Sequence, residues 1–497
     1  MKVLLLSYIF NPTTLILSVN LTAMKRLLSN SLILVILIIL SLNVEGQVLS
    51  EMTYTFGRSS YATSGILLKD STSLIAYTDG RFFLNGAFAK GFLRVKSNLD
   101  TLSSFLLPEF GQTNQLISLD SSHVLSVGYS TNQNINFKAR ADCYDLNYTY
   151  QWSLNLDTMR GNNFIQSACI DTNGFIYLTG YQDLDTVRGF NSRVFCLRMT
   201  FFGTIDWFKF YDWGSPLQAS YSIAQMENGN FMVGGTTGAL IVGMELDENG
   251  NRVAPLTTFF TPDSLYYNTN TIIQPLPNSR FFVRGIQQPG YVCLAITDRF
   301  GTALWREYGR GGVSIPMIHA SDGSITIGRS DSGSTNYRFE RIRNDGTLLW
   351  RLSYPNTINQ LYRNFGAIIP SYEGWGLAYG RKVDYSIAKT SVFLAKIANV
   401  GYPAPPLSTP LSVQVQAVSA YPNPTAGAVV LGIPSLVAGQ ATSVVVDALD
   451  MRGVRHQLQA SNDLGGYRLD LSGLAAGLYH LSLMVGGQRY VARVVRE

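Results

Sequence analysis

The sequence is poor in charge, histidine and cysteine. Only 14% of its 497 residues are charged, and 38 Lys and Arg against 33 Asp and Glu leave a formal net charge of +5. So small a surplus gives no reason to expect nucleic acid or an acidic membrane as a partner. A hydrophobic content of 46% is normal for globular proteins, which excludes extended disorder. A chain of this length suits two or three folded units, or one large repetitive unit.

Motifs of common enzymes and metal proteins are missing. The four histidines are scattered singly, without the clustered ligands that a zinc site needs. Neither a P-loop nor a dinucleotide-binding fingerprint occurs, and no G-x-S-x-G motif lies in a strand–turn–helix setting. The segments 171–174 and 247–250 resemble the start of a calcium loop but lack its closing acidic ligand, so we interpret them as tight turns. We therefore predict no catalytic residue, no metal ligand and no cofactor.

The N-terminal residues predict export. From Met24 the chain has a Lys-Arg pair, then an apolar run at 32–42, then small or modest residues before Gln47. This order is that of a secretory signal peptide. The run is about half as long as a bilayer-spanning helix needs. We expect residues 1–46 to be the signal-peptide region, with Met24 as the true start, and we expect no transmembrane anchor in the mature protein.

The body of the chain, from about residue 53 to 402, repeats itself. A turn followed by a strand that ends in Gly recurs every 42 to 55 residues, at Gly86, Gly128, Gly180, Gly235, Gly285, Gly328 and Gly380. Such a period is typical of propellers and solenoids. The segments between turns are short and rich in Phe, Tyr, Ile, Val and Thr, as strands are. Seven units of four strands predict a seven-bladed β-propeller over residues 47–402; a series of two-sheet β-sandwiches is the alternative.

A second signature is a turn with Gly followed by a strand with Trp. It occurs at 203–207, 301–305 and 346–350, and Gly250 occupies the same turn in a unit without Trp. We expect each Trp to pack between neighbouring blades. The pattern at 298–305 resembles the tryptophan-docking repeat of quinoprotein-type propellers. Those dehydrogenases also use two adjacent cysteines beside their cofactor, which this sequence lacks, so the resemblance implies an architecture and no cofactor.

The two ends of the repeat region predict a closed ring. The last unit stops after the strand at 393–397 and lacks an outer strand, whereas the first unit begins with a spare strand at 52–56. If the spare strand completes the last unit, the ring leaves no open edge.

The placement of cysteines argues against disulfides, although an even number in an exported protein would permit them. Cys143, Cys196 and Cys293 fall at the same place in their units, and equivalent places lie too far apart to be bridged. We expect buried free thiols that act as small hydrophobic side chains.

The composition changes abruptly after the repeat region. Four prolines between 403 and 410 predict a stiff linker over residues 403–416, and no lysine follows it. Apolar and polar residues alternate at 467–472 and again at 479–485. We therefore predict a small antiparallel β-sandwich over residues 417–497.

Four motifs mark this C-terminal segment. They are Tyr-Pro-Asn-Pro-Thr-Ala-Gly at 421–427, Asp-Met-Arg-Gly at 450–453, the stretch 471–479 and a basic final strand at 490–493. In order and spacing they resemble the type A C-terminal sorting domain of the type IX (Por) secretion system of Bacteroidetes. One departure is the final strand, which carries Arg where many members carry Lys.

The resemblance implies an export route and a set of sorting residues. Cargo crosses the inner membrane by its signal peptide and the outer membrane through a translocon that recognises the domain. A sortase-like protease then removes the domain, and the cargo is released or attached to surface lipopolysaccharide. Prolines here also fix an extended entry, glycines permit positive φ and the tyrosine fills the core. The implied sorting residues are Pro422, Asn423, Pro424, Gly427, Asp450, Gly453, Leu474, Gly477, Tyr479 and Arg493.

Together these features predict a protein that is secreted or held on the outer surface of a Gram-negative bacterium. Its expected partners are the type IX translocon and the sortase-like protease, and not nucleic acid. For the propeller we favour a non-enzymatic binding or adhesion module that contacts a glycan or a protein with one face. The alternative is an extracellular hydrolase or lyase with carboxylates gathered at the propeller mouth. A propeller fold alone leaves open whether the protein is an enzyme.

Overall fold

The computed structural model describes residues 48–497 apart from short gaps. The expected signal-peptide region 1–46, with Met24, and residues 403–414 of the expected linker lie outside the described residues. Val415 and Gln416, at the end of that linker, belong to a strand. The gaps are 57–58, 85–86, 132–136, 185–190, 261–267, 288–290, 311–316, 321, 331–335, 356, 359–360, 372–373, 385, 388, 399, 401–414, 434–442, 451–454, 464–465 and 486–487.

Every regular element in the described ranges is a β-strand, and the strands of the repeat region pair in antiparallel order. The long strand β5 serves two sheets, because residues 101–110 pair with β4 and residues 111–118 pair with β6. The region is therefore a β-propeller, as predicted, while its number of blades stays a prediction.

From inner to outer strand, the sheets are β2 (Ser60–Leu67), β3 (Ser73–Leu84), β4 (Ala87–Val95) and β5 (Thr101–Ser118); the second part of β5, β6 (His123–Thr131), β7 (Phe137–Asp145) and β8 (Tyr150–Asn155); β9 (Asn162–Ile170), β10 (Ile176–Asp183), β11 (Ser192–Met199) and β12 (Ile205–Tyr211); β13 (Gln218–Gln225), β14 (Phe231–Thr237), β15 (Leu240–Leu246) and β16 (Thr257–Phe260); β17 (Asn268–Leu276), β18 (Arg280–Gln287), β19 (Tyr291–Thr297) and β20 (Ala303–Arg310); β21 (Met317–His319), β22 (Ile325–Ser330), β23 (Asn336–Ile342) and β24 (Leu348–Pro355); and β26 (Leu361–Pro370), β27 (Gly376–Asp384), β28 (Lys389–Ile397) and β1 (Val48–Tyr54), with the short β25 (Thr357–Ile358) beside β26.

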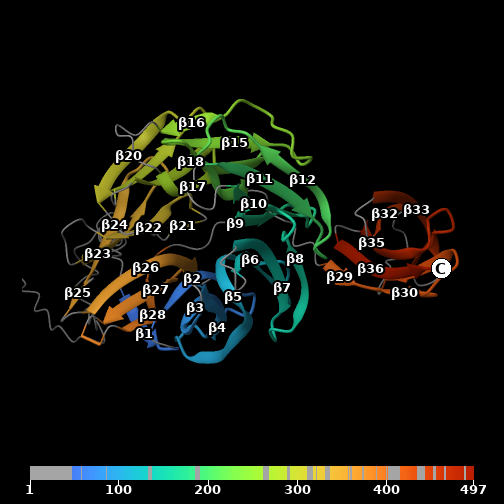
Figure 1. Ribbon diagram of the computed structural model, residues 1–497, viewed down its shortest axis with the longest axis horizontal. Coiled ribbons are helices and arrows are strands. Elements are labelled where there is room, and N and C mark those ends of the chain that lie inside the picture. The colour runs from blue at the N-terminus through green and yellow to red at the C-terminus, as the bar shows by residue number, and fades with distance from the viewer. Residues whose placement is uncertain are drawn as a thin grey trace, which may run out of the picture. The chain divides into compact units, whose positions relative to one another are not determined.

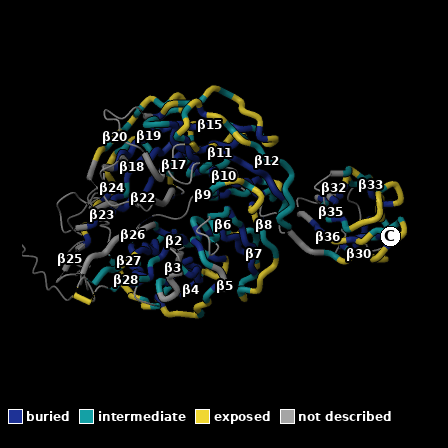
Figure 2. The backbone as a smooth tube through the Cα atoms, viewed as in Figure 1, coloured by how far each residue is buried: buried dark blue, intermediate teal, exposed yellow. Residues whose placement is uncertain are grey.

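The sheets follow one another around a common centre in chain order (Figure 1). The first strand of each sheet lies innermost and contacts the first strand of the next, as β9 does with β13 and β13 with β17. The middle strands are buried on both faces, and every residue of β14 is buried; Figure 2 shows the same dark interior with exposed turns at the rim. One blade alone could not cover both of its faces, and its two neighbours do so.

The ring is closed by its own N-terminal strand, which confirms the prediction from the two ends of the repeat. β1 pairs antiparallel with β28, and Met52 lies opposite Leu394. The strand starts four residues earlier than expected, at Val48. Phe56 follows it and stacks on the ring of Tyr77 with the centroids 4.1 Å apart. A strand from the chain's beginning therefore covers an edge that would otherwise be open.

A bulge in the inner strand explains the repeated glycines. Opposite Gly180 of β10, the register of β9 shifts by one residue. This shift brings the carbonyl oxygen of Phe164 so close that a Cβ on Gly180 would lie 1.9 Å from it, so a side chain does not fit. Gly128 and Gly235 face the same obstacle, with carbonyl oxygens at 2.0 and 2.1 Å.

In the first blade a tyrosine, not a glycine, lies opposite the bulge. Gly86 lies outside the described residues, and the register of β3 against the bulge in β2 puts Tyr77 at the position that Gly128 holds in the next blade. Opposite Tyr77, Gly91 leaves room for the tyrosine ring, since a Cβ there would lie 2.4 Å from its Cζ. The step from Tyr77 to Gly128 is 51 residues, against 42 from Gly86. The first interval of the predicted series was therefore short because it was counted from Gly86 and not from Tyr77, the residue at the bulge.

Side chains from one inner strand cap the edge of the next. Inner strands have a free edge toward the centre, and a polar side chain just after the bulge accepts a hydrogen bond from a backbone N–H of the following blade. These hydrogen bonds run from Leu116 N to Ser64 Oγ (2.8 Å), Ala168 N to Gln115 Oε1 (2.7 Å), Ile223 N to Ser167 Oγ (3.2 Å) and Ile273 N to Ser222 Oγ (3.0 Å). Two inner strands are exceptions, because β17 and β26 carry Ile272 and Ala367 at the matching position, and neither side chain has an acceptor.

We expect Ser167→Ala to lower the free energy of unfolding by about 1–3 kcal/mol, because it leaves the buried N–H of Ile223 without its acceptor. Urea denaturation followed by tryptophan fluorescence measures the change. Ser353→Ala is the matched control, since Ser353 is exposed on β24. Equal midpoints for the two variants would show that this hydrogen bond does not stabilise the ring.

The tryptophans of outer strands pack on glycine turns of the next blade, which confirms their predicted place between blades. Trp305 of β20 lies against Gly346 in the β23–β24 turn, where a Cβ would be 2.2 Å from the indole Cδ1. Gly346 also has a φ of +89°, which favours glycine in its own right. The same contact joins Trp207 to Gly250 and Trp152 to Gly203.

All four cysteines are free, as their spacing predicted. Cys143, Cys196 and Cys293 are buried on the third strands β7, β11 and β19. They do not share one register position, however, because only Cys293 lies opposite a bulge glycine, Gly285. Burial raises the pKa of each of these three thiols to about 12, which keeps them protonated and unreactive.

The C-terminal segment folds around a core of its own. Its sheet runs in the order β29-β36-β35-β32-β33-β34-β31-β30, antiparallel except between β29 and β36. The edge strand β30 follows β29 directly in the chain, and the residue between them, Val418, donates its backbone N–H to Val491 O of β36 over 2.9 Å. The two ends of the sheet therefore lie close to each other. Tyr467, Tyr479 and Leu481 are among the buried residues of this core, which are all from the same domain. The strands are β29 (Val415–Ala417), β30 (Ser419–Tyr421), β31 (Ala428–Gly432), β32 (Ser443–Asp450), β33 (Arg455–Asp463), β34 (Gly466–Asp470), β35 (Gly477–Val485) and β36 (Gln488–Arg496).

Candidate functional site

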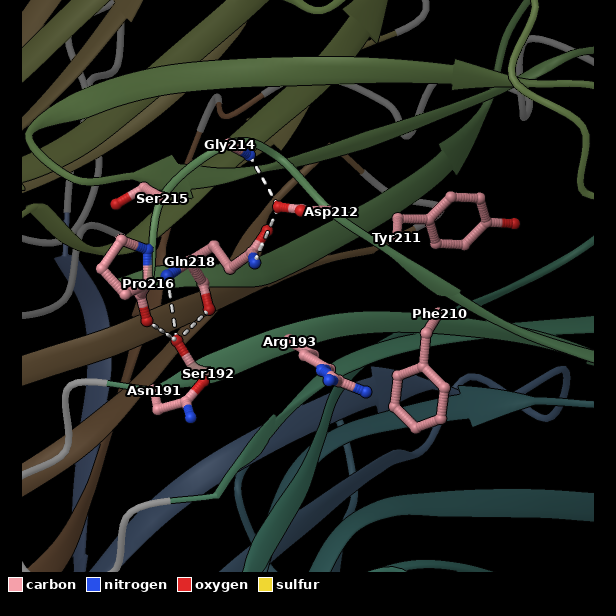
Figure 3. Close-up of a pocket in the computed structure, with 10 residues that line it drawn as sticks. All are labelled: Asn191, Ser192, Arg193, Phe210, Tyr211, Asp212, Gly214, Ser215, Pro216 and Gln218. Carbon is pink, nitrogen blue, oxygen red and sulfur yellow. Dashed lines mark hydrogen bonds between the residues drawn. The ribbon is translucent and has the colours of Figure 1, made fainter.

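A pocket of about 590 Å³ lies where one blade of the propeller leads into the next. It is formed by the start of β11, the end of β12 and the connection 212–217 that leads to the inner strand β13. Its volume is in the range of small-molecule sites. The lining residues, drawn in Figure 3, are Asn191, Ser192, Arg193, Phe210, Tyr211, Asp212, Gly214, Ser215, Pro216 and Gln218.

One wall of the pocket is held by Ser192. Its hydroxyl donates to the carbonyl oxygen of Gln218 over 2.7 Å and accepts from the Gln218 N–H over 2.9 Å. The backbone N–H of Ser192 donates to the carbonyl oxygen of Pro216 over 2.8 Å. The connection between the two blades is thereby tied to the first residue of β11, as the dashed lines in Figure 3 show.

The connection itself is anchored by Trp213. Its ring is buried in the core between the two blades, and its backbone N–H donates to Gln218 Oε1 over 2.6 Å. One carboxylate oxygen of Asp212 accepts from Gly214 N over 2.8 Å and from Gln218 Nε2 over 3.4 Å. The turn is therefore fixed before any ligand arrives, which lowers the entropy lost on binding.

Three exposed side chains of the pocket come from the β11–β12 pair and from the residue that follows it. Val194 lies opposite Tyr211 and Phe195 opposite Phe210. Because side chains alternate along a strand, Arg193 and Phe210 share a face, and Asp212 is the residue that directly follows β12. All three are exposed. Arg193 makes no hydrogen bond or ion pair within the described part of the chain.

Below the pocket the two blades are joined by a dense set of hydrogen bonds. Five side chains of the β9–β12 blade donate to backbone oxygens in the β15–β16 region of the next, at 248–250. Tyr211 is one of them, and in Figure 3 its ring points away from the other labelled side chains. The pocket thus stands on a rigid seam. The bonds are Tyr177 Oη to Glu248 O (3.3 Å), Arg198 Nη1 to Glu248 O (3.1 Å), Trp207 Nε1 to Glu248 O (3.1 Å), Lys209 Nζ to Asn249 O (2.8 Å) and Tyr211 Oη to Gly250 O (2.7 Å).

Sequence reasoning did not single out any of these lining residues. The connection 212–217, Asp-Trp-Gly-Ser-Pro-Leu, is turn-rich and carries one large aromatic residue, which could have drawn attention to it. Arg193 and Asp212 are 19 positions apart, and only the pairing of β11 with β12 brings them together.

The buried carboxylates do not gather at the propeller's centre. Asp142 on β7 pairs with Arg140 at 2.6 Å and with Lys90 at 3.6 Å, and Glu340 on β23 pairs with Arg351 at 2.5 Å. Both lie on third strands. In the described ranges, no buried carboxylate belongs to an inner strand. Both acidic groups are therefore engaged in ion pairs with cations of the same or a neighbouring strand.

The two segments that resemble calcium loops are tight turns, as interpreted from the sequence. One carboxylate oxygen of Asp247 accepts from the backbone N–H groups of Asn249 and Asn251, over 2.9 and 2.7 Å. Asp171 holds the turn at 171–175 in the same way. A carboxylate surrounded by N–H donors is engaged with its own turn. Within the described ranges, no group of three acidic, His or Cys residues is placed to hold a metal ion.

His123 has a partner that the sequence analysis overlooked. Its Nδ1 lies 2.9 Å from Asp120 Oδ2, three residues earlier in the same turn. The hydrogen bond that His123 donates to the Asp120 carboxylate raises the pKa of His123. The pair is local to one turn and does not reach the pocket residues.

The structure brings most of the predicted sorting residues to one end of the C-terminal sheet. Asp450, the last residue of β32, lies opposite Tyr479 of β35, which in turn lies opposite Val494 of β36. Tyr479 is buried, and its hydroxyl donates to Ala475 O over 2.8 Å. Leu474 packs against the same core. Gly453 lies outside the described residues.

The segment that begins at Pro422 is bonded to the final strand. The side-chain amide of Asn423 donates to Arg493 O over 2.8 Å, and its oxygen accepts from Val495 N over 2.8 Å. Thr425 N then donates to Val495 O over 2.8 Å. The bonds at Pro422 and Pro424 are both cis, and Gly427 O accepts from Leu471 N over 3.0 Å. Motifs about 70 positions apart thus meet along β36.

Residues 419–497 match the family of secretion system C-terminal sorting domains. This segment is a type IX sorting domain. The sorting domain makes the protein a secreted or cell-surface one, and it implies contact with the secretion machinery. In the described residues, no helix is long and apolar enough to cross a membrane.

Several solved structures are similar to about seven-tenths of the chain. A catalytically inactive virginiamycin B lyase from Staphylococcus aureus, in complex with quinupristin, is 11% identical with a TM-score of 0.46, over 71% of this chain and 99% of that one. The Dos1 propeller is 8% identical with a TM-score of 0.40, over 72% and 96%. The NanB sialidase from Streptococcus pneumoniae is 10% identical with a TM-score of 0.39, over 71% and 70%. Their differing activities carry no conclusion about this one. No curated protein matches the chain.

Proposed function

We propose that the propeller is a non-enzymatic binding module and that the sorting domain directs it to the cell exterior as a type IX cargo of a Bacteroidetes bacterium. The proposed domain boundaries are 47–402 for the propeller, 403–416 for the linker and 417–497 for the sorting domain. The observation that carries this proposal is the pocket of about 590 Å³ between β11, β12 and β13. Within the described residues it offers an arginine without an ion-pair partner, a carboxylate and an exposed aromatic ring on a fixed frame. A fixed frame with few polar groups and an aromatic surface is typical of ligand recognition.

The arrangement supports binding better than catalysis. A glycoside-cleaving site needs two carboxylates flanking one bond. Among the described residues that line the pocket, Asp212 is the single carboxylate, and one of its oxygens accepts hydrogen bonds from Gly214 and Gln218. The buried carboxylates Asp142 and Glu340 are paired with arginine or lysine. We therefore favour binding of a glycan or a protein over the hydrolase or lyase alternative.

We expect purified mature protein to bind at least one ligand on a glycan and protein array, and Phe210→Ala to remove that binding. Phe210 is 43% exposed in the pocket, and its ring provides the apolar contact surface. The matched control is Phe300→Ala, because Phe300 is 73% exposed in the β19–β20 turn, at the other end of the strands. Wild type without any ligand, or three proteins with equal binding, would contradict the proposal.

A further inference from the structure

We propose that this pocket binds an acidic carbohydrate, a glycan with uronate carboxylates, through Arg193, Asp212 and Phe210. The inference rests on the proposed function and names the class of ligand. Within the described residues the Arg193 guanidinium has no ion-pair partner, and Phe210 and Asp212 lie beside it in the same pocket.

The Arg193 side chain is suited to bind an anionic group of a ligand. Its side chain is exposed at the start of β11 and makes no hydrogen bond or ion pair within the described residues. A guanidinium has five N–H donors in a planar fork and no acceptor, and a carboxylate matches that fork with two parallel hydrogen bonds. The neighbouring Ser192 is buried and bonded to Gln218, so the backbone that carries Arg193 is held in place.

The Asp212 carboxylate is suited to accept hydrogen bonds from hydroxyl groups of the same ligand. Its Oδ1 accepts from Gly214 N and Gln218 Nε2, while no partner is recorded for its Oδ2 in the described part of the chain. An ionised carboxylate is an acceptor only. A ligand with negative charge alone would be repelled by Asp212, so the ligand must combine an anionic group with O–H donors. A sugar acid has both on one ring.

Phe210 provides a flat apolar surface beside these two groups. It lies on β12, two positions before Asp212, and its ring is 43% exposed. The C–H face of a pyranose ring can lie on such a surface and bury apolar area there. Arg193, Asp212 and Phe210 thus match the carboxylate, the hydroxyls and the apolar face of a uronic acid residue, and the pocket volume of about 590 Å³ leaves room for more than one sugar.

Isothermal titration calorimetry with trigalacturonate and with neutral galactotriose tests the inference. We expect wild type to bind trigalacturonate more tightly than galactotriose, and to bind it more weakly as salt is raised. Arg193→Gln should raise the Kd for trigalacturonate by about tenfold or more, with little effect on galactotriose, because it removes a charge-assisted hydrogen bond. The control is Arg299→Gln, since Arg299 is exposed in the β19–β20 turn beside Phe300; its Kd should equal that of wild type.

Other outcomes separate this inference from the proposed function. If array ligands bind and Phe210→Ala abolishes their binding, but trigalacturonate shows no preference over galactotriose, the acidic class is wrong and the binding module stands. Binding of a hexaglutamate peptide without binding of trigalacturonate would likewise overturn the carbohydrate in favour of an acidic polypeptide. If no array ligand binds at all, both proposals fail.

Discussion

Removal of residues 417–497 is expected to abolish the appearance of the protein outside the cell while leaving the propeller folded. The sorting domain has its own core, made of residues such as Tyr467, Tyr479 and Leu481. Its loss should therefore remove the export signal without opening the propeller ring. Fractionation of cells, with antibody detection in medium, surface and periplasm, measures export. The thermal transition of the truncated protein, followed by tryptophan fluorescence, measures the integrity of the propeller.

A point variant refines this test. Asn423→Leu removes both side-chain hydrogen bonds to the final strand, at Arg493 O and Val495 N, and should destabilise the sorting domain by about 1–3 kcal/mol and reduce export. Asn462→Leu is the matched control, because Asn462 is exposed on β33. Export of the truncated chain at the wild-type level would show that the sorting domain does not direct it.

Removal of residues 48–56 is expected to open the ring. The loss of β1 uncovers the edge of β28 from Val392 to Ile397, and the loss of Phe56 removes the ring that stacks on Tyr77. Deleting large packed aromatic side chains costs about 3 kcal/mol or more, and an uncovered strand edge promotes association between chains. We therefore expect a lower urea midpoint together with oligomers in size-exclusion chromatography.

Met52→Ser serves as the control for this deletion. Met52 is 40% exposed on the outer face of β1, so its replacement keeps the strand pairing and should leave both the midpoint and the monomer unchanged. A deletion variant with the wild-type midpoint and no oligomers would mean that the ring does not depend on its N-terminal strand.

Much of the fold could be predicted from local patterns. The period, the spare first strand and the Gly–Trp turns all arise from short segments that must satisfy the same packing in each blade. The pattern failed where a blade meets the same need with other residues. Tyr77 with Gly91 takes the place of the bulge glycine, and the turn before Trp152 carries Tyr148 at a φ of +63° instead of glycine.

The candidate pocket could not be predicted in this way, because nothing in its residues repeats. Arg193 and Phe210 become neighbours through the pairing of β11 with β12, and Ser192 reaches Gln218 across the boundary between two blades. Each is an ordinary surface residue when read alone. The same holds for the hydrogen bond from Ile223 to Ser167, which joins strands 56 positions apart.

The amino-acid sequence by itself determined the repetitive all-β body and the sorting domain at its end, since both depend on which residue types follow one another at short range. The tertiary structure decided which side chains stay without a partner at the surface. Whether Arg193 is exposed and without an ion-pair partner depends on every strand that does, or does not, pack against it, and that information is spread over several blades.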